Sequence, residues 1–406
     1  MAFKDGIKYR VPDSLLETSG KDWVFQPHPK LYEVLGTNVL EHYAYYKSNK
    51  MDKTYIPAYL YLGGAGTGKS RHASEFASSI QEAIELHVQH PLYHELAQRL
   101  KTLFVFHVSF ENGTPFTVEE MSNPWGAICS RMLHQLLDEP FEDIRDRYIA
   151  DPADVFELIA AAENVDLYDE FTGILVVDGI QKAFVEHDDG KNKNSTFYGL
   201  LGQIGGLSLM ERRRSKPEGG KLRSAPFIMT CVTATCFGPI QGFLADSHRK
   251  CVYLPLNRLN APTWKKDNSP VLNNSPTTRL LVNDVGGHAR AIELIADKLN
   301  KYLDGLQPNT AKLTNALCAG LRDRYGEAVS VLQNNTFAIV QCIISRQQIS
   351  LQDVIPGSTL RWEHVTASGL IWFESEGYGM LGYLVAPNIW FWLARLPPTK
   401  NTERLC

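Results

Sequence analysis

The feature that most constrains this chain is the segment Gly-Gly-Ala-Gly-Thr-Gly-Lys-Ser at residues 63–70. It matches the full GxxxxGK(S/T) pattern, with an apolar run before it at 58–62 and a helical pattern after it at 71–80. Glycines allow backbone angles that turn successive N–H groups toward phosphate oxygens, and the start of a helix adds partial positive charge. The motif therefore predicts a strand, a phosphate loop and a helix within a layered α/β fold.

The residue types of this loop predict a nucleotide bound together with a metal ion. Lys69 would reach the β- and γ-phosphates, and the Ser70 hydroxyl would ligate Mg²⁺. No NKxD-like guanine-reading segment is found, which favours ATP over GTP. We therefore expect ATP and Mg²⁺ as cofactors. The residues expected to bind nucleotide are Gly63, Gly64, Ala65, Gly66, Thr67, Gly68, Lys69, Ser70 and Arg71.

A second metal-side acid is expected at the end of a neighbouring strand. The apolar run 174–178 ends in Asp178, which we predict to hold Mg²⁺ together with Ser70. Many hydrolysing relatives place a glutamate directly after this aspartate to polarise the attacking water, but here Gly179 follows. Gln181 would orient a water yet is a poor base. The sequence thus predicts nucleotide binding with slow hydrolysis.

Two threonines end the next predicted strand. Thr233 or Thr235 would sense the γ-phosphate or hold the water, as a polar residue at this position does. The alternative is a pair of strand threonines selected for β-propensity. Both interpretations stay open at this point.

Five short apolar segments, rich in β-branched and aromatic residues, predict a parallel sheet covered on both faces. A helix is expected at 31–46 before them, and beyond Pro262 helical periodicity takes over, with an amphipathic run at 285–299. The composition, 44% hydrophobic and 21% charged, is typical of a globular protein. The expected strands are 58–62, 103–110, 174–178, 227–232 and 252–256.

The C-terminal region has the pattern of a winged helix. Helices are expected at 337–346, 351–355 and 361–369, followed by two strands at 370–374 and 382–385, and by a last helix that starts at Pro387. In transcription factors the third helix of such a domain reads DNA. Here that helix has only a thin basic surface, so a domain packed on the ATPase as a regulatory lid is favoured.

The chain is accordingly predicted to have five parts. These are an N-terminal helical segment at 1–55, a P-loop NTPase core at 56–260, a helical lid at 261–330, a winged-helix-like domain at 331–396, and a tail at 397–406.

Charge and cysteine content exclude several classes of protein. The formal net charge of −4 excludes a generally basic nucleic-acid coat. Seven scattered cysteines without a CxxC pair argue against a disulfide framework and a cysteine zinc site, and suit a cytoplasmic or nuclear setting. No stretch approaches the length needed to span a bilayer, so no membrane partner is expected. The basic segment 212–223 would be an exposed loop: a solvated hairpin, a nuclear-import signal or a nucleic-acid contact.

The phosphate loop, the 174–178 strand with Gly179, and the Thr233-Ala234-Thr235 strand end resemble the additional-strand P-loop ATPases, especially the STAND and AAA+ relatives. Residues 286–291, Gly-Gly-His-Ala-Arg-Ala, are similar to the GGxP(R/L)A element that opens a lid helix in that class, with Ala289 in place of the usual proline. The resemblance implies that His288 and Arg290 lie at the nucleotide, with Arg290 as a phosphate sensor. The alternative for Arg290 is a solvated charge at a helix start.

A narrower resemblance covers residues 30–395. The segments 108–115 (Val-Ser-Phe-Glu-Asn-Gly-Thr-Pro), 177–182 (Val-Asp-Gly-Ile-Gln-Lys) and 286–291 are similar to the P-loop domain of Crinkler-type effectors and of retrotransposon-hot-spot proteins. Members of that family often begin with a translocation header and end in a nuclease or kinase-like toxin domain. No LFLAK-like start and no D…ExK nuclease set is found here, so secretion into a host is implied only by the resemblance.

These observations lead to a main hypothesis and two rivals. The main hypothesis is an ATP- and Mg²⁺-binding switch or slow ATPase, with Lys69, Asp178, Gln181, Thr233 and Thr235 as the residues that act on the nucleotide. The first rival is a winged-helix nucleic-acid-binding or effector protein with a vestigial nucleotide site. The second is an oligomeric remodeller of nucleic acids that self-associates through the NTPase domain.

Overall fold

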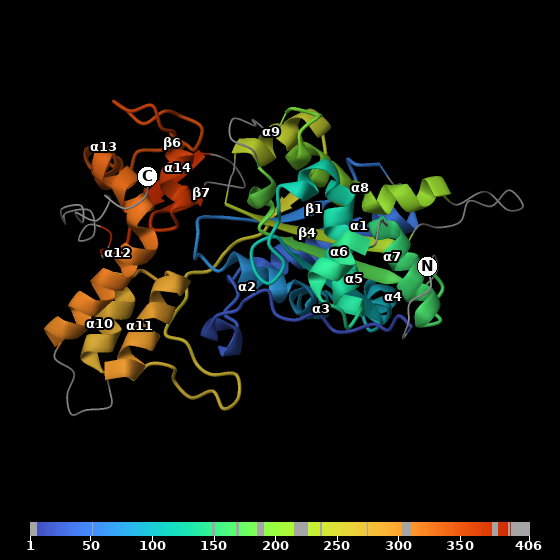
Figure 1. The fold of residues 1–406 in the computed structure, drawn as a ribbon, viewed down its shortest axis with the longest axis horizontal. Coiled ribbons are helices and arrows are strands. Elements are labelled where there is room, and N and C mark those ends of the chain that lie inside the picture. The colour runs from blue at the N-terminus through green and yellow to red at the C-terminus, as the bar shows by residue number, and fades with distance from the viewer. Residues whose placement is uncertain are drawn as a thin grey trace, which may run out of the picture.

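Helices and strands alternate through the first two thirds of the chain, and helices dominate the remainder (Figure 1). The computed structural model describes residues 6–50, 52–147, 151–167, 170–184, 191–214, 226–235, 238–273, 275–302, 310–375, 381–388 and 390. The strands are β1 Ala58–Leu62, β2 Leu103–Ser109, β3 Thr172–Asp178, β4 Phe227–Ala234, β5 Cys251–Tyr253, β6 Ile349–Ser350, β7 Trp372–Ser375 and β8 Leu381–Val385. The helices are α1 Leu31–Lys47, α2 Lys69–Ser74, α3 Phe76–Glu85, α4 Tyr93–Arg99, α5 Pro124–Leu136, α6 Phe141–Arg147, α7 Pro152–Ala162, α8 Thr196–Arg214, α9 Gly238–Ser247, α10 Pro276–Asp284, α11 Ala289–Tyr302, α12 Thr310–Asn334, α13 Thr336–Ile344 and α14 Trp362–Ala367.

Strands β1 to β5 form one parallel sheet in the order β2-β3-β4-β1-β5. The strand that enters the phosphate loop, β1, lies between β4 and β5, and β4 separates it from β3. Because all five strands are parallel, the carboxyl ends of β1 to β4 meet at the same edge of the sheet. The predicted α/β fold with a five-stranded parallel sheet is confirmed, with strand ends within a few residues of those expected.

Hydrophobic side chains of the sheet alternate between two cores. On β3, Leu175 and Val177 pack on one face, and Ile174 and Val176 pack on the other. The first core is completed by α5, α7, α8 and α9, and the second by α1, α3 and α4. The sheet is therefore buried on both sides, which is why its strands read as continuous apolar runs.

A third core lies in the C-terminal part, at the left of Figure 1. It joins helices α10 to α12, here called the lid (residues 276–334), to α13, α14 and a three-stranded antiparallel sheet of order β6-β8-β7, here called the C-terminal module (residues 336–390). Val285 and Leu321 from the lid pack in the same cluster as Val365 and Leu384 from the module. The lid and the C-terminal module are thus held together by one core.

Two sequence-based expectations in this region were wrong. Residues 351–355 form turns and a bridge between Val354 and Arg361 rather than a helix, because Ile355 precedes Pro356 and is pushed out of the helical region. The wing has three strands, since β6 pairs with β8. The helix expected after Pro387 lies largely outside the described residues.

The basic segment also differs from the expected loop. The backbone of α8 continues through Arg214, so the first three arginines of the segment belong to a helix, in keeping with their helix propensity. The remainder of the segment, 215–223, lies outside the described residues.

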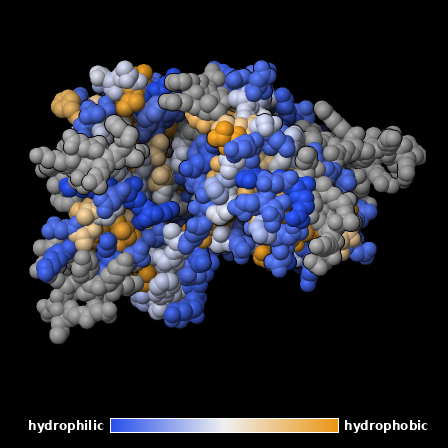
Figure 2. Space-filling view, in the orientation of Figure 1, coloured by the Kyte–Doolittle hydropathy of each residue, from blue (hydrophilic) through white to orange (hydrophobic). Residues whose placement is uncertain are grey.

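Within the described ranges, no helix is long and apolar enough to cross a bilayer. The face seen in Figure 2 is mainly hydrophilic, and its hydrophobic side chains form small scattered groups.

Candidate nucleotide-binding site

The phosphate loop closes on itself around two glycines with left-handed backbone angles. Gly66 has φ 73° and Gly68 has φ 94°, and Gly68 caps the start of α2. The Lys69 ammonium is buried and donates to the Gly64 carbonyl over 2.6 Å, while the Thr67 hydroxyl donates to the same oxygen over 2.8 Å. Lys69 therefore lies folded over the loop, bonded to a neutral carbonyl that is a weaker partner than a phosphate oxygen.

Asp178 lies at the end of β3, close to the start of α2. Its Oδ1 accepts a 2.6 Å hydrogen bond from the Thr233 hydroxyl, and that hydroxyl also accepts the Gly179 N–H over 2.9 Å. Burial raises the pKa of Asp178, and hydrogen bonds from Thr233 and Ser70 oppose that rise. Among the described residues, the second oxygen, Oδ2, is buried without a hydrogen-bond partner. A buried carboxylate oxygen beside a serine hydroxyl fits Mg²⁺, which takes oxygen ligands.

Gln181 connects the ends of three strands. Its Oε1 accepts the Thr235 N–H over 3.2 Å, and its Nε2 donates to Oε1 of Glu111 over 2.5 Å. Glu111 follows β2, two residues after Ser109. Sequence reasoning did not assign Glu111 to the site. The residue lies in the 108–115 segment of the family resemblance, but its place beside Asp178 follows from the pairing of β2 with β3.

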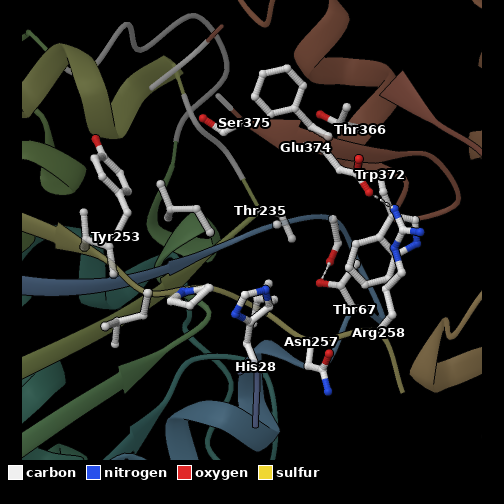
Figure 3. Close-up of a pocket in the computed structure, with 18 of the residues that line it drawn as sticks. His28, Thr67, Thr235, Tyr253, Asn257, Arg258, Thr366, Trp372, Glu374 and Ser375 are labelled. Carbon is white, nitrogen blue, oxygen red and sulfur yellow. Dashed lines mark hydrogen bonds and ion pairs between the residues drawn. The ribbon is translucent and has the colours of Figure 1, made fainter. Parts of the chain in front are cut away.

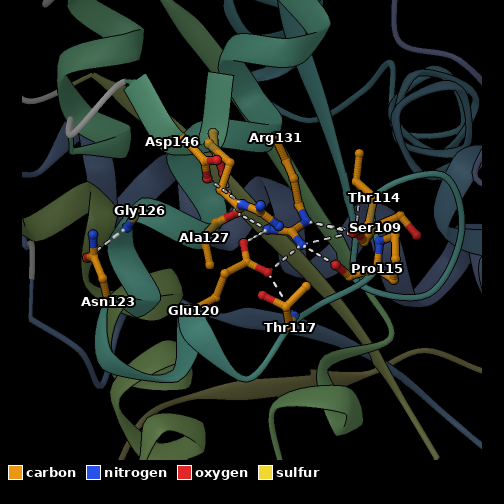
Figure 4. Close-up of polar contacts among 12 residues, drawn as sticks. Ser109, Thr114, Pro115, Thr117, Glu120, Asn123, Gly126, Ala127, Arg131 and Asp146 are labelled. Carbon is orange, nitrogen blue, oxygen red and sulfur yellow. Dashed lines mark hydrogen bonds and ion pairs between the residues drawn. The ribbon is translucent and has the colours of Figure 1, made fainter. Parts of the chain in front are cut away.

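A buried ion pair holds the loop that carries Glu111 (Figure 4). Arg131 of α5 pairs with both oxygens of Glu120 at 2.6 and 3.0 Å, with side chains that are 1% and 5% exposed. The same guanidinium donates to the carbonyls of Ser109, Thr114, Pro115 and Ala127. The segment from the end of β2 to Glu120 is therefore fixed from within by charge-assisted hydrogen bonds.

Both lid residues implied by the family resemblance contact the phosphate loop. His288 is buried, and its Nε2 lies 3.2 Å from the Ala65 carbonyl. Its Nδ1 accepts a hydrogen bond from the Ala291 N–H, so the ring proton is on Nε2. Nε2 therefore donates to the Ala65 carbonyl. The Arg290 N–H donates to the Gly66 carbonyl over 3.2 Å, and the Arg290 side chain pairs with Glu293 at 3.5 Å.

An N-terminal strap, residues 15–26, lies across the same site and was not predicted as part of it. Arg71 of α2 donates to the strap carbonyls of Gly20 and Trp23, at 2.6 and 2.9 Å. The Glu293 carboxylate of α11 accepts hydrogen bonds from the Thr18 hydroxyl and the Gly20 N–H of the strap. The strap thus connects α2 to the lid. No spacing in its sequence indicates this, because its contacts are mostly backbone contacts.

The C-terminal module also contacts the phosphate loop through backbone atoms. The Ala65 N–H donates to the Ala367 carbonyl at the end of α14, over 3.0 Å. A Cβ on Gly64 would lie 2.3 Å from the backbone of Gly369, and a Cβ on Gly369 would lie 1.8 Å from the Ala65 oxygen. The two segments approach this closely only because both positions are glycine.

Two cavities flank the loop. One of about 460 Å³ is lined by Lys69, Ser70, Asp178, Glu111 and Arg290, with the strap and Arg324 around it. Because these charged groups surround the end of the phosphate loop, this cavity is the candidate nucleotide site.

The other cavity, of about 690 Å³, lies between the sheet and the C-terminal module (Figure 3). Arg258 there pairs with Glu374 and lies 5.6 Å from the Trp372 ring. Its lining includes Gly63, Gly64 and Thr67 but neither Lys69 nor Asp178, both of which line the smaller cavity.

Comparison with curated proteins found a match to Crinkler effector protein 108 of Phytophthora sojae. The two are 28% identical over 393 residues, which is 92% of this chain and 44% of that protein. The chain therefore spans less than half the length of this relative. No family model matches the chain.

Three solved structures show some similarity to the chain, and two of them are complexes with DNA. They include the Aeropyrum pernix ORC1 protein in complex with DNA (TM-score 0.39, 12% identity, 94% of each chain) and Drosophila ORC bound to DNA (0.31, 12%, 96% of this chain and 95% of that one). A Thermotoga maritima RuvB mutant has a TM-score of 0.31 and 11% identity, over 90% of this chain and 95% of its own. The fold described above rests on the chain's own strand order and not on these weak similarities.

Proposed function

We propose that this chain binds ATP with Mg²⁺ and acts as a nucleotide-dependent switch with slow ATP hydrolysis, in the manner of the STAND and AAA+ classes. The observation that carries the proposal is one cavity in which Lys69, Ser70 and Asp178 meet at the phosphate loop. The loop is at the same time hydrogen-bonded to the lid and to the C-terminal module.

Each group has a role that its surroundings support. Lys69 would exchange its Gly64 carbonyl for a phosphate oxygen, which gains a charge-assisted bond. Ser70 and the unpartnered Oδ2 of Asp178 would hold Mg²⁺, which supplies neutralisation of phosphate charge. Thr233 would hold Asp178 in place from β4, and Arg290 would sense phosphate from the lid.

The switch part of the proposal rests on the contacts of the loop carbonyls and amides. The Ala65 N–H donates a hydrogen bond to α14 of the C-terminal module, and the Gly66 carbonyl accepts one from the start of α11 in the lid. A phosphate bound in the loop would change the hydrogen bonds that these backbone groups can make. Nucleotide occupancy would therefore be coupled to the positions of the lid and the C-terminal module.

The nucleic-acid-binding alternative is not favoured by the position of α14. Glu363 of this helix accepts the Gly238 N–H from the P-loop domain over 2.9 Å, and the helix ends on the phosphate loop at Ala367. A helix in this position is turned toward its own ATPase domain rather than toward a DNA groove. The similarity to Crinkler effector protein 108 supports a nucleotide-dependent role within a Crinkler-type effector.

Titration with a fluorescent ATP analogue, with and without Mg²⁺, tests the proposal. We expect binding by the wild type and roughly 100-fold weaker binding by Lys69→Ala, equivalent to about 2.7 kcal/mol. Lys101→Ala serves as the matched control, because Lys101 is exposed just before β2, at the opposite edge of the sheet. Equal affinity of wild type and Lys69→Ala would contradict the proposed site.

A further inference from the structure

The space beside Asp178 where hydrolysing relatives place a glutamate is already filled in this chain. Gly179 follows Asp178 with φ 79°, and a Cβ added to it would lie 2.5 Å from Cγ and 3.2 Å from the carboxyl carbon of Glu111. A side chain at residue 179 would be strained by the positive φ and would have to displace the Glu111 side chain, which arrives from β2. A carboxylate thus reaches the position beside Asp178 from the neighbouring strand.

Glu111 is held there by a directional contact. Gln181 Nε2 donates to it over 2.5 Å, while the other end of the amide accepts the Thr235 N–H. Its distance to the Lys182 ammonium is 4.0 Å, and the two side chains are 35% and 54% exposed, so an ion pair there contributes little. The ion pair with Lys182 therefore does not account for the position of Glu111, and the hydrogen bond from Gln181 is its closer polar contact.

The backbone that carries Glu111 is rigid. The Phe110 N–H donates to the Asp178 carbonyl over 2.9 Å, which ties the end of β2 to the end of β3. The Ser109 hydroxyl accepts the N–H groups of Glu111 and Asn112, and the Ser109 carbonyl accepts from the buried Arg131. A catalytic group must be held in this way if its geometry is to be reproducible.

We propose that Glu111 is the general base for ATP hydrolysis and that Gln181 is its positioning residue; this inference rests on the proposed function. Glu111 lines the 460 Å³ cavity together with Lys69, Ser70 and Asp178. As the oxygen of a water bonds to the γ-phosphorus, Glu111 takes the proton of that water. The bond from that phosphorus to the bridging oxygen breaks, ADP leaves with the electron pair, and phosphate carries the water oxygen. The proton then passes from the part-exposed Glu111 to solvent.

The test compares the full chain with Glu111→Gln, which keeps size and removes basicity. We expect the hydrolysis rate to fall at least ~100-fold, the lower end of what a general base supplies. The affinity for ATP should stay within about threefold of wild type, and the bound nucleotide should remain ATP while wild type converts it to ADP. Glu119→Gln is the control, because Glu119 is exposed on the same loop and outside the cavity.

Each outcome separates this inference from the proposed function. If wild type binds ATP but hydrolyses it no faster than Glu111→Gln, the role of Glu111 is overturned and ATP binding is not affected. Failure of wild type to bind ATP would overturn both. Lost ATP affinity in Glu111→Gln would assign Glu111 to binding and also overturn the inference.

Gln181→Leu tests the positioning role separately. We expect it to lower the hydrolysis rate with an unchanged ATP affinity, a split that loss of folding does not produce. The double variant with Glu111→Gln should be no slower than Glu111→Gln alone, because Gln181 acts through Glu111. Additive losses in the double variant would show that Gln181 acts independently.

Discussion

In the part of the chain that the structure describes, three histidines are buried where an imidazolium would be poorly solvated. Burial lowers the pKa of His42 to about 3, and that of His72 and His288 to about 4. His288 needs its neutral form to accept from Ala291 while donating to Ala65. His72 lies in α2 and bonds the Gly68 carbonyl, so two of the three belong to the surroundings of the phosphate loop.

These histidines predict an acid-sensitive fold. Above pH 6.5 both folded and unfolded chains keep them neutral, and their contribution to stability is complete. As the pH falls toward 4, the unfolded chain takes up protons that the folded chain excludes, so stability is lost. Each such group lowers the free energy of unfolding by about 1.4 kcal/mol per pH unit in this range, so three give a slope of up to about 4 kcal/mol per pH unit.

Urea unfolding at pH 7, 6 and 5 measures this slope. His42→Leu should reduce it by about 1.4 kcal/mol per pH unit, because one buried titrating group is removed. His94→Gln, at an exposed histidine, should leave it unchanged. A slope that is the same in His42→Leu and wild type would argue against this account.

At the scale of elements, the loop after β2 shows how a buried ion pair positions a site. Arg131 and Glu120 are nearly inaccessible, and the arginine lies 4.7 Å from the Phe110 ring and 4.8 Å from the Phe141 ring. Breaking such a pair leaves a charge without its partner in the interior. The pair thus fixes the path of the chain on which Glu111 lies.

Arg131→Met is therefore expected to destabilise the protein by about 3–5 kcal/mol. The exposed pair of Arg147 and Glu139, with side chains 54% and 29% exposed, is the comparison. Arg147→Met should cost less than about 1 kcal/mol in the same urea titrations. Similar losses of unfolding free energy in Arg131→Met and Arg147→Met would mean that burial does not strengthen the first ion pair.

At the scale of the whole molecule, the phosphate loop is a place where both the lid and the C-terminal module contact the P-loop domain. The two C-terminal parts share one core, so a displacement of either moves the other. Their hydrogen bonds with the loop include backbone bonds at Ala65 and Gly66 and the His288 side chain on the Ala65 carbonyl, and the close approach of Gly369 to Ala65 leaves little room for adjustment. This arrangement is the structural basis for the proposed switch.

Gly369→Val tests the coupling. Its Cβ would collide with the Ala65 oxygen, so we expect the C-terminal module to separate from the loop and bound nucleotide to exchange roughly tenfold faster, a change of about 1.4 kcal/mol. Gly357→Val is the matched control. Gly357 is in the same module with φ 77°, against 75° at Gly369, but no atom of the described residues lies within 4 Å of an added Cβ. Equal exchange rates in the two variants would show that backbone strain, and not the contact, is responsible.

The sequence predicted the elements of the nucleotide site well, because their patterns are local. The phosphate loop is a contiguous motif, and the strand before Asp178 is an unbroken apolar run, so both follow from neighbouring residues. Thr233 was one of two open candidates as a sensor, and the structure shows its hydroxyl bonded to Asp178. The roles of these residues toward ATP stay predictions.

Residues that reach the site from elsewhere were not predictable from their own surroundings. The N-terminal strap bonds Arg71 and Glu293 from far along the chain, mostly through backbone groups that any residue provides. Residues 351–355 were misread as a helix, because periodicity was weighed above the restriction that Pro356 imposes on Ile355.

By itself, the sequence determined the class of the fold and the position of the phosphate loop, since strand alternation and glycine angles are properties of short segments. The tertiary structure alone decided which acid lies beside Asp178. The sequence showed a glycine there and suggested a site without a base, whereas the pairing of β2 with β3 brings Glu111 into that space. The physical reason is that parallel strands collect their carboxyl ends at one edge, whatever their separation along the chain.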